Sequence, residues 1–172
     1  MKASLLSSLK PVAALLLACY AGLVSASDHY QMAIVQASPG AAEIQNGAIE
    51  QGLLKLSDTR QSSSDLFAKT MALCVANTQL AKYETAIPTC NRAVHIARTN
   101  AMANSAERRE MQALALTNRG VLRWVSQDIA KAQQDFQRSA QLSDHTLVLN
   151  NLQQFETRLE NLMARATASV LP

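Results

Sequence analysis

The 172-residue sequence is poor in aromatic residues, because Phe, Trp and Tyr together make up 4% of it while 48% of the residues are hydrophobic. A core must therefore be built from aliphatic and small side chains, which suits closely packed helices better than a β-sandwich. With 5 Gly and 4 Pro, the chain also lacks the turn residues that many short strands require. Alternation of apolar and polar residues appears nowhere at useful length. These absences predict an all-α fold in one domain with its own core.

The patterns of most catalytic, cofactor and nucleic-acid sites are missing too. The sequence has no glycine-rich phosphate loop and no CxxC or CxxCH pattern, and His29, His95 and His145 are scattered without metal-ligand spacing. The formal net charge is +3, but Lys2 and Lys10 lie in a segment that we expect to be removed, which leaves 3 − 2 = +1. So small a charge does not indicate a nucleic-acid partner. We therefore expect no enzyme activity, no cofactor and no nucleic-acid binding.

Residues 1–26 have the pattern of a secretory signal peptide. Lys2 and Lys10 give a basic start, residues 11–24 form an apolar stretch, and Val24, Ser25 and Ala26 place a small residue before the expected cut after Ala26. The apolar stretch is shorter than the roughly 20 residues that span a bilayer. The sequence therefore predicts export to the periplasm or beyond, with no transmembrane helix in the mature chain.

Two alternatives concern the same end of the chain. Leu-Leu-Ala before Cys19 is similar to a bacterial lipobox, which would make the protein a lipid-anchored envelope assembly factor. Cleavage after Ala26 would instead leave Ser27, Asp28 and His29 at the new amino terminus. A free amine with His in third place is a planar ligand set for copper(II) or nickel(II), so a metal-binding periplasmic protein is the second alternative.

Four helical blocks are predicted in the mature part, at residues 40–56, 65–98, 105–142 and 144–168, with a polar loop at 57–64. The second block pauses near Ala81 and Lys82, and the third near Gln127 and Asp128. In the fourth block, apolar residues recur at spacings of four, three, four and three, as on one face of a helix: Val148, Leu152, Phe155, Leu159 and Leu162.

Two boundary residues lead to specific expectations. Asp144 is expected to cap the fourth block. Pro88 removes a hydrogen bond from any helix interior, so we expect the helix around it to start late, with Pro88 in or near the first turn.

The second and third blocks are related by an internal repeat with an offset of 46 residues. Cys74 and Gly120 each stand twelve positions before an alanine, and the alanine is followed four positions later by Cys90 or Phe136. Ala93 and Ser139 then follow three positions further on. We therefore interpret residues 66–98 and 112–144 as the clearest repeats of one domain over residues 27–172, with the first and fourth blocks as cap helices.

This pattern resembles the tetratricopeptide repeat of exported bacterial proteins. Asn118, Arg119 and Gly120, followed by Ala132, Phe136 and Leu142, are close to the family signature. The offset from Ala86 to Ala132 is 132 − 86 = 46, against about 34 in the family, and the excess lies around residues 99–111. The resemblance implies a short array of antiparallel helix pairs with Gly120 against Ala132 where two helices cross.

The resemblance also gives the two cysteines that remain after signal removal a place in the fold. Cys74 and Cys90 fall at the two facing positions of one helix pair. We predict a disulfide between them, because the cysteine count is then even and the compartment oxidising. The alternative is a pair of buried free thiols.

Members of the family bind peptides or partner proteins on the concave face formed by the first helix of each pair. Seven residues map to that face here: Met71, Val75, Thr78, Asn118, Val121, Trp124 and Val125. The basic positions with which some relatives hold a carboxylate are absent. The resemblance therefore implies an envelope interaction module or scaffold with an unidentified protein or peptide partner. In the alternative interpretation, Val121 and Trp124 pack against the cap helices.

Overall fold

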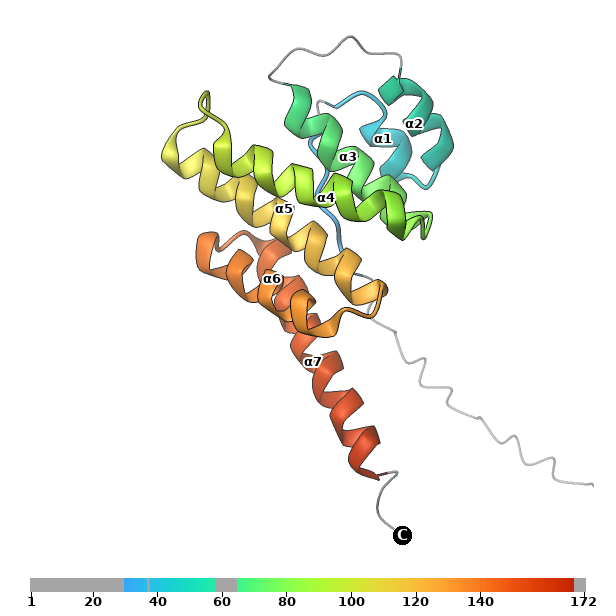
Figure 1. Ribbon diagram of the computed structural model, residues 1–172, viewed down its shortest axis with the longest axis vertical. Helices are drawn as coiled ribbons and strands as arrows, with labels where there is room; N and C mark the ends of the chain where they lie inside the picture. The colour runs from blue at the N-terminus through green and yellow to red at the C-terminus, as the bar shows by residue number, and fades with distance from the viewer. Residues whose placement is uncertain (1–29, 37, 58–64, 169–172) are drawn as a thin grey trace, which may run out of the picture.

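The computed structural model of the protein describes residues 30–36, 38–57 and 65–168 (Figure 1). All regular secondary structure in this part of the chain is helical, which confirms the all-α prediction. The helices are α1 (Ala41–Gln45), α2 (Ile49–Ser57), α3 (Asp65–Gln79), α4 (Tyr83–Thr99), α5 (Ser105–Val125), α6 (Ile129–Leu142) and α7 (Thr146–Ala168). The predicted signal peptide, Cys19 and the sequence Ser27-Asp28-His29 lie outside the described residues.

From α3 to α7, each helix packs mainly on its neighbours along the chain. Figure 1 shows these helices stacked in sequence order, with α1 and α2 beside α3 and with the end of α7 extending away from the others. Helix α5 lies in the middle of the stack and also contacts α3 and α7. The molecule therefore has one continuous body in which α5 is central.

The turns between α3 and α4 and between α5 and α6 have the same geometry. Ala81 (φ 54°) and Gln127 (φ 68°) both adopt left-handed backbone. The N–H of Ala81 donates to the Thr78 carbonyl at 3.0 Å, and that of Gln127 donates to the Trp124 carbonyl at 3.0 Å. Both pauses were predicted, and the matching residues are 127 − 81 = 46 positions apart.

The predicted single helix at residues 40–56 is wrong, because the structure breaks it between Gln45 and Ile49. Gly47 (φ 83°) takes a left-handed conformation that suits glycine after a helix end. Its N–H donates to the Ile44 carbonyl at 3.2 Å. The second segment then folds back, so that a Cβ on Gly52 would lie 2.6 Å from Ile44 Cγ1.

The prediction for Pro88 is also wrong, since Tyr83 begins α4 and Pro88 is the sixth helical residue rather than part of the first turn. Pro88 has no N–H to donate to the Glu84 carbonyl four positions earlier. Both residues are exposed, so solvent can satisfy that carbonyl. The helix therefore continues through the proline.

The cap of α7 differs from the prediction as well. His145, not Asp144, stands immediately before the helix, and its Nδ1 accepts from the Leu147 N–H at 3.1 Å. The His145 carbonyl also accepts the N–H of Val148 at 2.9 Å. Asp144 is exposed one position too early for this role.

The predicted disulfide joins Cys74 of α3 to Cys90 of α4, with the two Cα atoms 4.8 Å apart. Both residues are fully buried and pack with Ala86 and Leu122. The bond links the two helices of the pair and closes a loop of 16 residues, which restricts the conformations of the unfolded chain.

The corresponding positions of the next helix pair are occupied by Gly120 and Phe136. A Cβ on Gly120 would meet three atoms of the Phe136 ring at 2.9–3.1 Å. The closest side chain to Gly120 is therefore Phe136 and not Ala132, which corrects the predicted contact. Ala132 is buried in the same cluster as Phe136.

Candidate functional site

Residues 30–35, which we call the strap, run in a non-helical conformation along α3, α5 and α7. In Figure 1 the strap is the blue segment that passes behind α4 and α5. It leads into α1, and no strand lies beside it in the described part of the chain, so its backbone must find hydrogen-bond partners among side chains. Two asparagines of the helices supply them.

Asn118 of α5 binds both backbone polar groups of Ala33. Its Oδ1 accepts from the Ala33 N–H at 2.7 Å, and its Nδ2 donates to the Ala33 carbonyl at 2.8 Å. Asn118 is fully buried. A buried carboxamide needs partners for both ends, and the strap provides them.

Asn151 of α7 binds Gln31 in the same way. The Gln31 N–H donates to Asn151 Oδ1 at 3.1 Å, and Asn151 Nδ2 donates to the Gln31 carbonyl at 2.6 Å. Residues two apart in an extended chain face the same side. The two asparagines therefore bind alternate residues of the strap through backbone hydrogen bonds.

Tyr30 anchors the amino-terminal end of the strap among aromatic rings. Its ring is stacked on Phe136 with centroids 5.6 Å apart, and its edge meets Trp124 at 5.9 Å. The Arg158 guanidinium lies 4.7 Å from the ring centroid, within cation–π distance. These contacts come from α5, α6 and α7 and define an aromatic subsite.

The Tyr30 hydroxyl has no hydrogen-bond partner among the described residues, although it is buried. Burial raises the pKa of Tyr30 to about 12, and the positive charge of Arg158 opposes this rise in part. Burial therefore keeps the phenol neutral up to a higher pH than in solvent.

The other strap side chains join the hydrophobic core. Met32 packs against three separate clusters of buried residues, which involve α1 to α7 between them. Ala33 and Val35 pack with Phe67 and Met71 on α3. The strap is thus the element that links otherwise separate parts of the core.

The structure places the seven predicted groove residues along the strap or at its rim. Met71, Val75, Thr78, Asn118 and Val121 are buried, Trp124 is half-buried, and Val125 is 36% exposed. Most of the predicted face is therefore covered by the chain's own residues 30–35. The alternative contact with a cap helix is present as well, since the rings of Trp124 and Phe155 of α7 lie 5.4 Å apart.

Space remains at both ends of the strap. Beside Tyr30, a cavity of about 340 Å³ is lined by Thr78, Trp124 and Val125, among others. At the Val35 end, a more apolar cavity of about 460 Å³ is lined by residues of α3 and α5 and by the connection between α4 and α5. Both cavities therefore adjoin the strap, one at each end of its described residues.

Sequence reasoning missed Asn151, Arg158 and the strap itself. Asn151 had a detectable signal, because it is a polar residue between Val148 and Leu152 on the apolar side of the last helix. It also lies 151 − 118 = 33 positions after Asn118, close to the family period of about 34.

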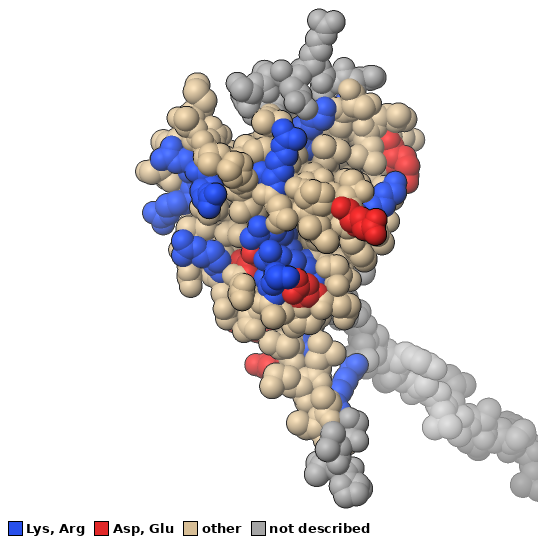
Figure 2. Space-filling model, viewed as in Figure 1, with Lys and Arg blue, Asp and Glu red and all other residues tan. Residues whose placement is uncertain are grey.

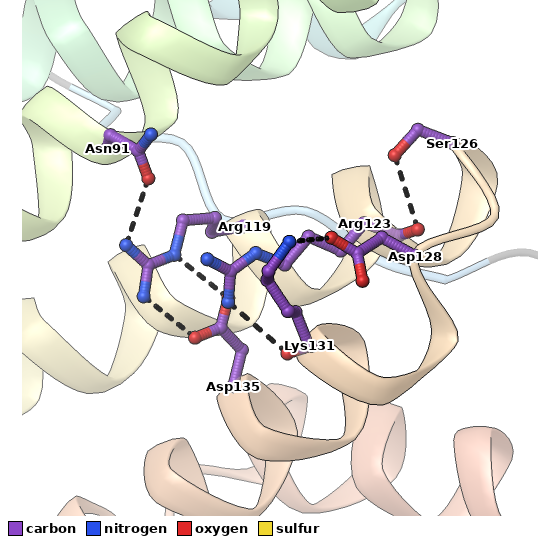
Figure 3. Close-up of polar contacts among 7 residues, drawn as sticks. All are labelled: Asn91, Arg119, Arg123, Ser126, Asp128, Lys131 and Asp135. Atoms are coloured by element: carbon purple, nitrogen blue, oxygen red, sulfur yellow. Dashed lines mark hydrogen bonds and ion pairs between the residues drawn. The ribbon is translucent and has the colours of Figure 1, made fainter.

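The opposite face carries a network of ion pairs between α5 and α6. Asp135 is buried and accepts from Arg119 at 2.8 and 2.9 Å and from Arg123 at 2.7 Å. Burial lowers the pKa of the Arg123 guanidinium, and the charge of Asp135 opposes this effect. Figure 3 shows the hydrogen bond that Arg119 donates to Asn91 and the neighbouring ion pair of Lys131 with Asp128.

Figure 2 shows more Lys and Arg than Asp and Glu on the face where α4, α5 and α6 lie. Arg119 and Arg123 of α5 and Lys131 of α6 are each paired with a carboxylate. Three cations here share two carboxylates, so the cluster links α5 to α6 and keeps one positive charge in excess.

Within the part of the chain that the structure describes, no three His, Cys, Asp or Glu side chains gather as metal ligands. The described helices include none with the length and apolar character needed to cross a membrane. Comparison of the chain with protein-family models, curated proteins and solved structures finds no match.

Proposed function

We propose that this chain is a protein-interaction module of the tetratricopeptide type in the cell envelope, and that its groove holds an extended polypeptide segment by the backbone. The observation that carries the proposal is the pair of bidentate contacts from Asn118 and Asn151 to alternate residues of an extended segment. Such contacts recognise a main chain in extended form, which is a ligand class and not a reaction centre.

Two further observations support the repeat interpretation. The turns at Ala81 and Gln127 are alike in conformation and hydrogen bonding, with an offset of 46 residues. With the same offset, the contact of Cys74 with Cys90 corresponds to that of Gly120 with Phe136. Matching turns and matching crossings are what a repeated helix pair requires.

Export is proposed from the signal-peptide pattern at residues 1–26, and the Cys74–Cys90 bond fits an oxidising compartment. Mass measurement of the protein isolated from the envelope tests this point. A mature chain that starts at Ser27 supports the proposal. A diacylated Cys19 at the amino terminus would replace it with the lipid-anchored alternative.

Site-specific photo-cross-linking in cells tests the interaction function. A photoreactive residue at Val125, on the rim of the groove, should cross-link to a partner, whereas one at the exposed Arg92 of α4 should not. Asn151→Leu removes a backbone contact of the groove and should change the yield of the cross-link, whereas Asn150→Leu at the exposed neighbour should leave it unchanged. Equal cross-linking from Val125 and Arg92, or none from either, would contradict the proposed groove.

A further inference from the structure

We propose that the strap competes with a partner for the groove. The partner is an extended segment of another protein that presents four residues in order: an aromatic residue, a residue of any type, an apolar residue and a small residue. This inference rests on the proposed function and adds to it a sequence preference and a means of control. It follows from how each strap residue is held.

The backbone contacts define where a segment must be extended. Gln31 and Ala33 are each bound through both N–H and carbonyl, so a partner must present the same two backbone units. The side chain of Gln31 is exposed, which makes the second position free.

The remaining positions are restricted by the core. The first lies between Phe136 and Trp124, which favours a planar ring. Met32 reaches three apolar clusters, which favours a long apolar side chain. Ala33 is buried against Phe67 and Met71 while its backbone is fixed by Asn118, so a larger side chain would overpack this position.

The strap binds this groove less well than a segment with a better first residue would bind it. Its Tyr30 hydroxyl is buried without a partner among the described residues, a cost that a phenylalanine would avoid. The unfilled cavity beside Tyr30, with Trp124 and Val125 in its wall, is where an incoming segment can begin to displace it.

The strap remains tethered to α1 when it leaves the groove, so it competes as an intramolecular ligand at high effective concentration. A partner must therefore bind better than the strap, and it gains from the same contacts without the unsatisfied hydroxyl. Apparent affinity for a partner then depends on the fraction of molecules with an open groove.

Fluorescence anisotropy with a labelled synthetic peptide tests this directly. The peptide has the sequence of residues 30–36 with the change Tyr30→Phe, and the proteins are the oxidised mature chain and its Tyr30→Phe and Tyr30→Ala variants. Tyr30→Ala should bind the peptide about tenfold more tightly than the wild type, because its strap is weakened. Tyr30→Phe should bind it about tenfold more weakly, because its strap is strengthened.

A matched pair of modified peptides checks the mode of binding. Methylation of the Ala33 nitrogen removes the hydrogen bond to Asn118 and should reduce affinity at least tenfold. Methylation of the Met32 nitrogen should cost much less, since that N–H makes no hydrogen bond within the described residues. Equal losses from the two peptides would overturn the backbone-reading geometry.

Three results would overturn the inference as a whole. One is a folded, oxidised Tyr30→Ala protein that binds no peptide, which would make the strap a permanent part of the core. If that variant does not fold, the inference is overturned instead by equal peptide affinities of the wild type and the Tyr30→Phe variant. The third is a concentration-dependent dimer that the peptide does not dissociate, which would make a second copy's strap the occupant.

Failure of this inference can be distinguished from failure of the proposed function. Loss of peptide binding with a retained, Asn151-dependent cross-link at Val125 refutes only the competitor role of the strap. Loss of both refutes the groove as an interaction site.

Discussion

The side-chain amide of Asn118 pairs with both backbone polar groups of Ala33, which stands 85 positions earlier in the chain. This contact joins the amino-terminal segment to the central helix and closes the core over α3. It replaces the strand partner that an extended segment ordinarily requires.

Removal of the Asn118 carboxamide should destabilise the fold. Asn118→Leu keeps a similar volume but leaves the buried N–H and carbonyl of Ala33 without partners. We expect the free energy of unfolding to fall by about 3 kcal/mol in urea denaturation. The control, Asn150→Leu on the exposed side of α7, should stay within about 0.5 kcal/mol of wild type. Similar midpoints for the two variants would contradict the assigned contact.

Reduction of the Cys74–Cys90 bond should lower stability by about 3 kcal/mol, the value expected for a loop of this size. Thermal unfolding with and without reductant measures the effect. Thiol titration in denaturant, on protein purified from the envelope without reductant, should find no free thiol among Cys74 and Cys90. Two free thiols would show that the native protein lacks the bond.

Asp135→Ala should destabilise the contact between α5 and α6, because it leaves two arginines beside a buried position without their carboxylate. We expect a cost of about 3 kcal/mol, at the low end for a broken buried pair, since Arg119 and Arg123 are partly exposed. Asp128→Ala breaks the exposed pair with Lys131 and should change the urea midpoint little. If both variants unfold alike, the Asp135 network does not hold the helices together.

Stability should fall at alkaline pH through Tyr30. Its pKa is about 12 in the folded protein and about 10 when exposed, so between these values the unfolded state binds fewer protons. The contribution of Tyr30 is complete below pH 10 and is lost as the pH rises through 12. Urea denaturation of the wild type and Tyr30→Phe from pH 9 to 12 measures it. As the pH rises across this window, the wild type should lose more unfolding free energy than Tyr30→Phe. A constant difference between the two proteins would show that the Tyr30 phenol is not buried in the folded state.

Much of the helical framework was predictable, because its signals are local. The spacing from Val148 to Leu162 gave α7, and the turn residues near Ala81 and Gln127 gave the pauses. The break at Gly47 was missed because a glycine within a helical pattern can either continue or end a helix. In the structure, the left-handed φ of Gly47 ends the helix.

Some of the residues that contact the strap were named from the sequence, but the strap itself was not. Asn118 and Trp124 were assigned from the family resemblance, whereas the strap has no helical period and no partner strand in the described residues. Its conformation depends on Asn118 and Asn151, which are 85 and 120 positions away from the residues they bind. Local patterns carry no information about such distant side-chain contacts.

The proposed groove depends on Asn118 and Asn151, which hold the strap by its backbone. Amide hydrogen exchange of the mature, oxidised protein by NMR measures this residue by residue. We expect slow exchange at Gln31 and Ala33, and a specific acceleration at Ala33 in Asn118→Leu. Exchange at the unprotected rate for Ala33 in the wild type would contradict it.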